Sequence, residues 1–217
     1  MSQKDKEGIL FSTEEMNNIM ADTMKFSEDK PETIFGMTFK NAEERRAYFR
    51  EELRKKLPEL KKIEGFPIGS DEDILNLSDP PYYTACPNPW LNQFVEEWEK
   101  EKTVLENEGK RSKDFEVKEP YADNISVGKN NPIYTAHSYH TKVPHEAIMK
   151  LLYYYTQPGD IVYDGFAGTE MTGIASGLCK IGSKEVNMSH IQKGERHCIC
   201  SDLTHIAAVF DEKLKDS

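Results

Sequence analysis

The stretch Pro158–Gly173, PGDIVYDGFAGTEMTG, decides the expected fold. Its DIVYD segment has the pattern of a short buried strand, a glycine-rich turn follows, and MTGIASGLCK has helical periodicity. Such a turn lets backbone approach a nucleotide-like ligand, whose carboxylate or phosphate the helix N-terminus favours. A tight strand-to-helix connection also needs glycine for steric reasons alone, so the turn by itself leaves both interpretations open.

The segments on either side of this stretch extend the pattern. Pro144 can open a helix through HEAIMKLLYYYT, RHCICS is typical of a second strand, and LTHIAAVFDEKL of a further helix. An acid at the tip of the second strand, here Asp202, can accept both hydroxyls of a ribose. The order predicts an α/β fold, namely part of a Rossmann-like doubly wound sheet.

The first 70 residues predict a helical arm ahead of this sheet. Ser12 with Glu15, and Asn41 with Glu44, have capping-box spacing before helical stretches, and Pro58 is expected to end the second helix. We therefore expect a helical arm at residues 1–70 and a partial α/β domain at 71–217.

Between the two parts lies NLSDPPYYTACPNPWL, from Asn76 to Leu91. DILNLS before Asp79 predicts a short strand, and Asn88 with Pro89 predicts the start of a helix. A proline-rich loop between strand and helix is the favoured interpretation. The alternative is a Pro-Pro-x-Tyr peptide that binds an aromatic groove as a polyproline II helix.

Composition narrows the classes of function and location. The 217 residues carry a formal net charge of −10, so a chain that meets DNA must leave most of the phosphate contacts to other parts. We see no signal peptide or membrane-spanning stretch, and expect a cytoplasmic protein. The four cysteines are expected as reduced thiols.

A metal site is not expected. We interpret Cys198 and Cys200 as thiols on opposite faces of a strand, which suits one tetrahedral zinc poorly, and prefer buried thiols at both. His137, His140 and His145 are interpreted as polar surface residues.

Two motifs carry a resemblance to a known family. YHTKVPHEAIMKLLYYYTQPGDIVYDGFAG resembles the adjoining motif X and motif I of amino-group DNA methyltransferases, and SDPPYY is similar to their Asp-Pro-Pro-Tyr catalytic motif. DPPYYTACPNP resembles the N-terminal part of large DNA-methylase-like proteins of bacterial restriction and defence systems.

The resemblance implies S-adenosylmethionine as the methyl donor. It places the following residues around that cofactor: Thr141, Lys142 and Pro144 beside it, Asp164, Gly165, Phe166 and Gly168 at its methionine portion, and Asp202 at its ribose. It also implies that His140 lies on the cofactor side. Glu170 departs from the family, whose turn normally has a second glycine there.

The resemblance also gives the proline-rich loop a task, with Asp79, Pro80, Pro81 and Tyr82 as its catalytic residues. The lone pair of an exocyclic amine is delocalised into its ring, so the site must accept hydrogen bonds from the amine and draw it towards sp³ geometry. Asp79 and the carbonyl of Pro80 can do this. Tyr82 can stack on a base turned out of the duplex.

Two hypotheses follow. The first is a fragment of a DNA methyltransferase that acts on adenine N6 or cytosine N4, because the chain supplies fewer strands than such a sheet needs. A later Asp-Pro-Pro element would reduce Asp79 to a structural or target-positioning role. The second is a non-catalytic, degenerate interaction module of a restriction or defence assembly, which Glu170 and the net charge favour. DNA, and a protein partner or missing half, are the expected partners.

Overall fold

The computed structural model describes residues 30–129, 131–136, 142–183, 186 and 191–202. They fall into two compact units, of which the first ends at Cys86 and the second begins at Pro87. The part of the proline-rich loop from Asn76 to Cys86, which includes Asp79 and Tyr82, thus belongs to the first unit. The helices expected after Ser12 and after Asp202 lie outside the described residues.

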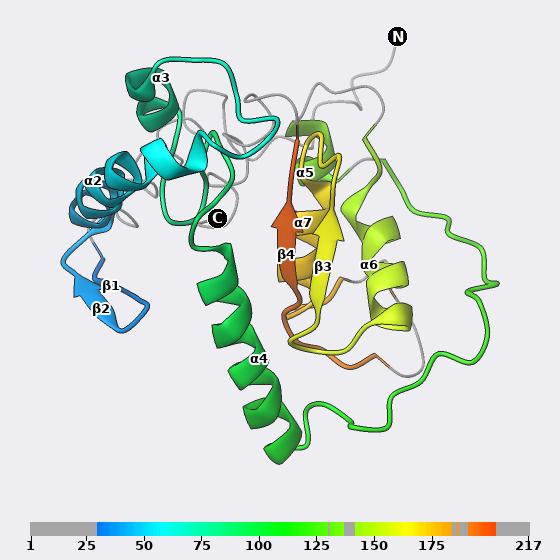
Figure 1. Ribbon diagram of the computed structural model, residues 1–217. Coiled ribbons are helices and arrows are strands. Elements are labelled where there is room, and N and C mark those ends of the chain that lie inside the picture. The colour runs from blue at the N-terminus through cyan, green and yellow to red at the C-terminus, as the bar shows by residue number, and fades with distance from the viewer. Residues whose placement is uncertain (1–29, 130, 137–141, 184–185, 187–190, 203–217) are drawn as a thin grey trace, which may run out of the picture. The chain divides into compact units, whose positions relative to one another are not determined.

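The first unit opens with a β-hairpin that the sequence analysis did not predict (Figure 1). β1 (Glu32–Ile34) pairs antiparallel with β2 (Met37–Phe39). The two turn residues, Phe35 and Gly36, have φ of 51° and 76°, and two successive positive φ angles give a turn whose twist matches paired strands.

Helix α2 (Ala42–Leu60) follows, with the predicted cap. The Asn41 side chain accepts a hydrogen bond from the Glu44 N–H at 2.9 Å, and the Glu44 carboxylate accepts one from the Lys40 N–H at 2.6 Å. The prediction that Pro58 ends this helix is wrong, because Pro58 lies inside its last turn. Only Glu59 and Leu60 follow the proline in the helix, so the helix loses a single backbone hydrogen bond close to its end.

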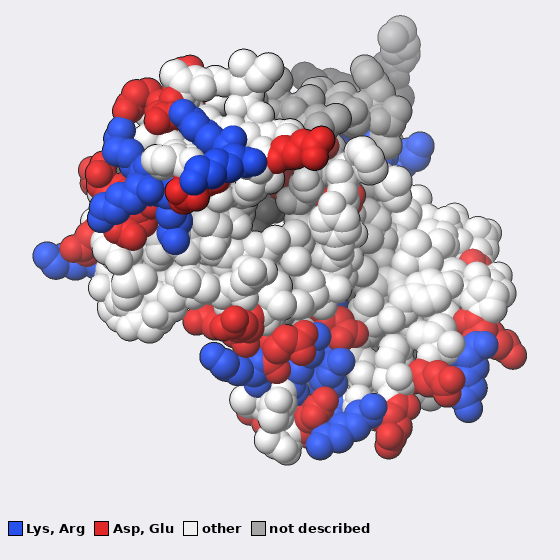
Figure 2. Space-filling model, viewed as in Figure 1, with Lys and Arg blue, Asp and Glu red and all other residues white. Residues whose placement is uncertain are grey.

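Residues 71–76 form helix α3 (Asp71–Asn76), so the strand predicted for DILNLS is wrong. The cause is local: Ser70 accepts a hydrogen bond from the Asp73 N–H at 3.1 Å, and the Asp73 carboxylate accepts one from the Ser70 N–H at 3.3 Å. This capping box starts a helix, and the adjacent Ile74 and Leu75 are both buried, which a strand with one buried face would not allow. Figure 2 shows acidic and basic side chains intermixed over α2 and α3.

The second unit begins with helix α4 (Leu91–Asn107). It starts two residues later than predicted, because the Asn88 side chain accepts from the Trp90 N–H at 2.9 Å and closes a turn ahead of the helix. On α4, Phe94 stacks on Trp98, which in turn stacks on His197 with ring centroids 4.6 Å apart.

The remaining elements are α5 (Pro132–Ala136), α6 (His145–Tyr155), β3 (Ile161–Asp164), α7 (Met171–Leu178) and β4 (His197–Cys200). β3 and β4 pair in parallel, with Val162 opposite Cys198 and Asp164 opposite Cys200. The predicted order of strand, glycine turn, helix and strand is therefore confirmed at these elements. Helices α6 and α7 share a core with the following buried side chains: Met149, Leu152, Tyr153, Ala175, Cys179 and Val186.

The described residues form a mixed α/β fold with two small two-stranded sheets. A larger doubly wound sheet stays a prediction. Among the described helices, none combines the length and the apolar character that crossing a bilayer requires.

Candidate functional site

The turn between β3 and α7 is organised by Asp164. One of its carboxylate oxygens accepts from the Phe166 N–H at 3.1 Å, and the other accepts from the Thr172 hydroxyl at 2.6 Å. The side chain at the strand end thus fixes both the turn and the first turn of the helix. This local bond pattern is the reason that an aspartate suits the last position of β3.

The end of β4 joins the same turn. The Ser201 N–H donates to the Asp164 carbonyl at 2.8 Å, and the Ala167 N–H donates to the Ser201 carbonyl at 3.0 Å. One residue further, the Asp202 carboxylate accepts from the Gly168 N–H at 2.8 Å. The structure therefore brings together the glycine turn and the acid that the sequence placed at the tip of the second strand.

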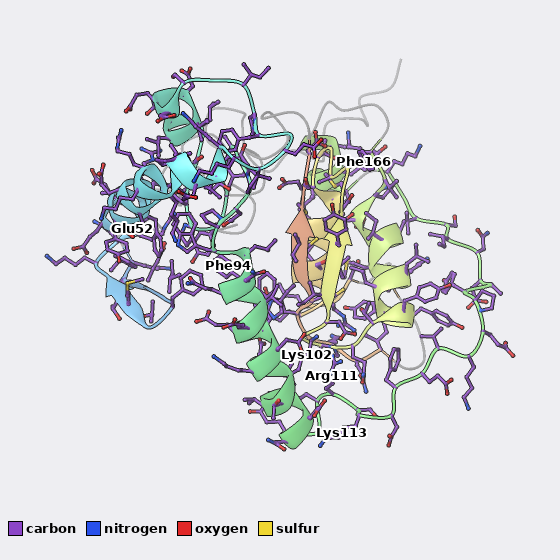
Figure 3. The ribbon with its side chains drawn as sticks, in the orientation of Figure 1. Glu52, Phe94, Lys102, Arg111, Lys113 and Phe166 are labelled. Carbon is purple, nitrogen blue, oxygen red and sulfur yellow. The ribbon has the colours of Figure 1, made fainter. Side chains whose placement is uncertain are left out.

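The turn leaves its backbone open on one side. Gly168 has φ of 57°, and a Cβ added there would meet nothing closer than the Phe166 carbonyl at 3.9 Å. Phe166 is 86% exposed and lies at the carboxyl end of β3 (Figure 3). Open backbone beside an exposed aromatic ring and a carboxylate is a frame that fits a nucleoside-type cofactor.

Glu170 is the exception in this frame. It precedes α7 with φ of 54°, in the left-handed region that favours glycine, and its side chain is buried. In sequence, this residue is the departure from the family turn noted above. The backbone thus has the conformation of a glycine position, while the residue carries a carboxylate.

The segment expected beside the cofactor is only partly described. Thr141 lies outside the described residues, and so does His140. The Lys142 ammonium lies 4.4 Å from the centroid of the Tyr134 ring on α5, and Pro144 is buried directly before α6.

His145, interpreted from sequence as a surface residue, is buried, and that interpretation is wrong. Its Nε2 lies 3.2 Å from a carboxylate oxygen of Glu146, which also accepts from the Asn131 side chain. Burial lowers the pKa of His145, and the Glu146 carboxylate opposes that shift. The helical spacing of His145, Met149 and Leu152 on one face was the signal that could have revealed its burial.

The proline-rich loop holds Asp79 in a buried ion-pair cluster. The two Arg45 terminal nitrogens donate to the two Asp79 oxygens at 2.5 and 3.1 Å, and Arg46 Nε donates to Asp79 at 2.9 Å. The Pro80 carbonyl accepts from the same Arg45 Nη1 at 2.9 Å. Both groups that the sequence analysis assigned to an incoming amine are therefore hydrogen-bonded to arginine.

Further contacts hold the loop, one from α2 and one within the loop itself. Arg50 donates to the Ser78 carbonyl at 3.1 Å, and the Tyr83 N–H closes the loop onto the Asp79 carbonyl at 3.0 Å. Tyr82 is 48% exposed, with Arg45 Cζ lying 5.1 Å from its ring centroid. These arginines were not predicted as site residues, although Arg45 precedes Phe49 and Leu53 at helical spacing on the buried face of α2.

The prediction that Cys198 and Cys200 lie on opposite faces of a strand is wrong. The sulfur atoms of Cys198 and Cys200 lie 3.4 Å apart, so they share one face of the strand, as residues two positions apart must. Both are partly buried, whereas Cys86 and Cys179 are buried. No group of three potential metal ligands occurs within the described part of the chain.

Comparison with known families supplies the context for both sites. The family model described as DNA methylase, N6_N4_Mtase, matches residues 4–192, which include the proline-rich loop and the glycine turn. No curated protein and no solved structure was found to match the chain. Because the match spans most of the sequence, the chain belongs to the DNA methylase family.

Proposed function

We propose that the chain acts in S-adenosylmethionine-dependent methylation of DNA, at adenine N6 or cytosine N4. Its membership of the DNA methylase family implies DNA as the substrate. The observation that carries the cofactor half is the hydrogen bond between Asp202 and the Gly168 N–H, which places an acid at the turn between parallel strands.

On the cofactor side, S-adenosylmethionine supplies an electrophilic methyl group on its sulfonium. Backbone around Gly168 lets the methionine portion approach, since no Cβ stands in its way. Asp202 accepts ribose hydroxyls through its carboxylate, whose two oxygens can each accept more than one hydrogen bond. Asp164 holds the turn, and Lys142 and Pro144 flank the site.

On the acceptor side, the proposal assigns the target amine to the loop from Asp79 to Tyr82. The Asp79 carboxylate and the Pro80 carbonyl would accept its two N–H groups, which draws the nitrogen towards sp³ geometry and makes its lone pair available. Pro81 keeps the loop backbone from donating a competing hydrogen bond. Tyr82, about half exposed, would stack on the base.

The reaction is tested by incubating the chain with S-adenosylmethionine and DNA, digesting the DNA to nucleosides and measuring N6-methyladenine and N4-methylcytosine by mass spectrometry. We expect one of the two products, and its loss in Asp79→Ala with cofactor binding retained. Equal loss of product and of cofactor binding in Asp79→Ala would show that Asp79 is structural.

A second candidate is a non-catalytic, methyltransferase-like interaction module. The arginines on Asp79 and the carboxylate at Glu170 favour it, because both occupy positions that catalysis and cofactor binding would use. The two candidates separate on one property: a working enzyme binds S-adenosylmethionine at the β3–α7 turn, and a module with a degenerate site does not.

A further inference from the structure

Arg45 makes the two hydrogen bonds that the proposed reaction assigns to a substrate amine. Its Nη1 donates to Asp79 Oδ1 at 2.5 Å and to the Pro80 carbonyl at 2.9 Å. One planar nitrogen thus bridges a carboxylate and a neighbouring backbone carbonyl. An exocyclic amine of adenine or cytosine also has two N–H groups on one planar nitrogen, so it needs the same pair of acceptors.

The Arg45 guanidinium also resembles a bound base in its contact with an aromatic ring. Arg45 Cζ lies 5.1 Å from the centroid of the Tyr82 ring, so a flat, conjugated group already lies against the aromatic side chain that would stack on a base. Arg45 is 3% exposed, which places its guanidinium within the loop rather than at its rim.

Asp79 and Arg45 each have a second ionic partner, so Arg45 can move away from Asp79 without leaving either charge unpaired. Arg46 also donates to Asp79, at 2.9 Å, so the Asp79 carboxylate keeps a cationic partner when Arg45 is removed. Arg45 has a second anionic partner, because its Nε donates to Glu32 at 3.0 Å and the Glu32 side chain is 27% exposed. A neutral amine can therefore replace Arg45 without leaving Asp79 as an unpaired buried charge.

We propose that Arg45 is a resident occupant of the amine position in the loop, and that it must withdraw before the loop can bind a base. This inference rests on the acceptor role given to the loop under the proposed function. It identifies the ligand of the vacated position as a planar aromatic amine of the adenine or cytosine type, and makes Arg45 the residue that decides access.

The test uses the full chain and two matched probes, 9-ethyladenine and 9-ethylpurine, which differ only in the exocyclic amine. In Arg45→Ala we expect 9-ethyladenine to bind at least about tenfold more tightly than to the wild type, because its amine can donate to Asp79 and to the Pro80 carbonyl in place of Arg45. We expect no such gain for 9-ethylpurine. Ligand-observed NMR titration measures both affinities.

Arg54→Ala is the matched control, because Arg54 lies on the same helix and pairs with Glu72 and Glu51 on the surface. It removes the same charge and should gain no affinity for either probe. Circular dichroism checks the fold, and Arg45→Met keeps the aliphatic volume of the side chain and should show the same preference for adenine over purine. Folded Arg45 variants that bind both probes alike, or no better than the wild type, would overturn the inference and leave Arg45 as a structural ion-pair partner.

The outcome can be told apart from a failure of the cofactor proposal, whose residues lie in the second unit. Adenine preference in Arg45→Ala without S-adenosylmethionine binding would refute the cofactor site and keep the Arg45 inference. Cofactor binding without adenine preference would do the reverse.

Discussion

The Asp202 carboxylate accepts a hydrogen bond from the backbone N–H of Gly168 at 2.8 Å, across 34 residues of sequence. The two residues follow parallel strands whose carboxyl ends meet at one edge of the sheet. Cofactors of open α/β sheets bind at this edge, and the pairing of glycine turn and acid is therefore the central feature of the proposed site.

Replacing Asp202 by alanine should weaken S-adenosylmethionine binding by about ten- to a hundredfold, because a charged hydrogen-bond acceptor is worth about 1.5–3 kcal/mol. Calorimetric titration measures the change. Asp123→Ala, at an exposed aspartate of the connection before α5, is the control and should bind as the wild type does. Unchanged affinity in Asp202→Ala would remove Asp202 from the site.

Glu170→Gly should raise both stability and cofactor affinity. Glycine adopts the φ of 54° without the penalty of a Cβ, which should add about 0.5–1 kcal/mol to the free energy of unfolding. Loss of the carboxylate should strengthen binding of a ligand that has a carboxylate of its own. Glu170→Ala separates the two effects, since it removes the charge and keeps the Cβ. A Glu170→Gly variant with unchanged affinity would indicate a turn that was never used for the cofactor.

Two glycines of the second unit should respond to alanine with opposite signs. A Cβ at Gly194 would lie 2.5 Å from Pro158 Cβ, so Gly194→Ala should lower the free energy of unfolding by about 1–3 kcal/mol. At Gly177, inside α7, an added Cβ meets no atom within 4 Å, and Gly177→Ala should raise it by about 0.5–1 kcal/mol. Urea denaturation of both variants checks the signs, and a neutral Gly194→Ala would contradict the described packing.

Stability should fall in mild acid because of His145. Burial lowers its folded-state pKa below the unfolded value of about 6.5, so the unfolded chain binds the proton more readily. Neutral His145 makes its full contribution to the free energy of unfolding above about pH 6.5. That contribution is lost as the pH falls from there through the folded-state pKa. Thermal melts of wild type and His145→Gln across this range test the assignment. If His145→Gln loses as much stability in acid as the wild type does, another residue causes the loss.

The sequence predicted those parts of the fold that depend on local signals. The periodicity of residues 161–200 predicted β3, α7 and β4. The spacing of Asn41 and Glu44 predicted where α2 begins. The strand predicted before Asp79 was wrong, although the capping-box spacing of Ser70 and Asp73 was visible in the sequence.

The contacts of the proline-rich loop could not be predicted in the same way. Arg45 and Asp79 are 34 residues apart. Arg45 shares the buried face of α2 with Phe49 and Leu53 at helical spacing, but the sequence does not show which residue it meets there. The partner of Arg45 depends on how α2 packs against the loop, which is a tertiary property. Sequence therefore located the residues of the candidate loop and missed the arginines that engage them.

The most direct test of the central claim is calorimetric titration of the full chain with S-adenosylmethionine, with Asp164→Ala in parallel and its fold checked by circular dichroism. Asp164 holds the turn through Phe166 and Thr172, so we predict saturable binding to the wild type that the folded variant loses. Absence of binding at millimolar cofactor, or binding that Asp164→Ala leaves unchanged, would contradict a cofactor site at the β3–α7 turn.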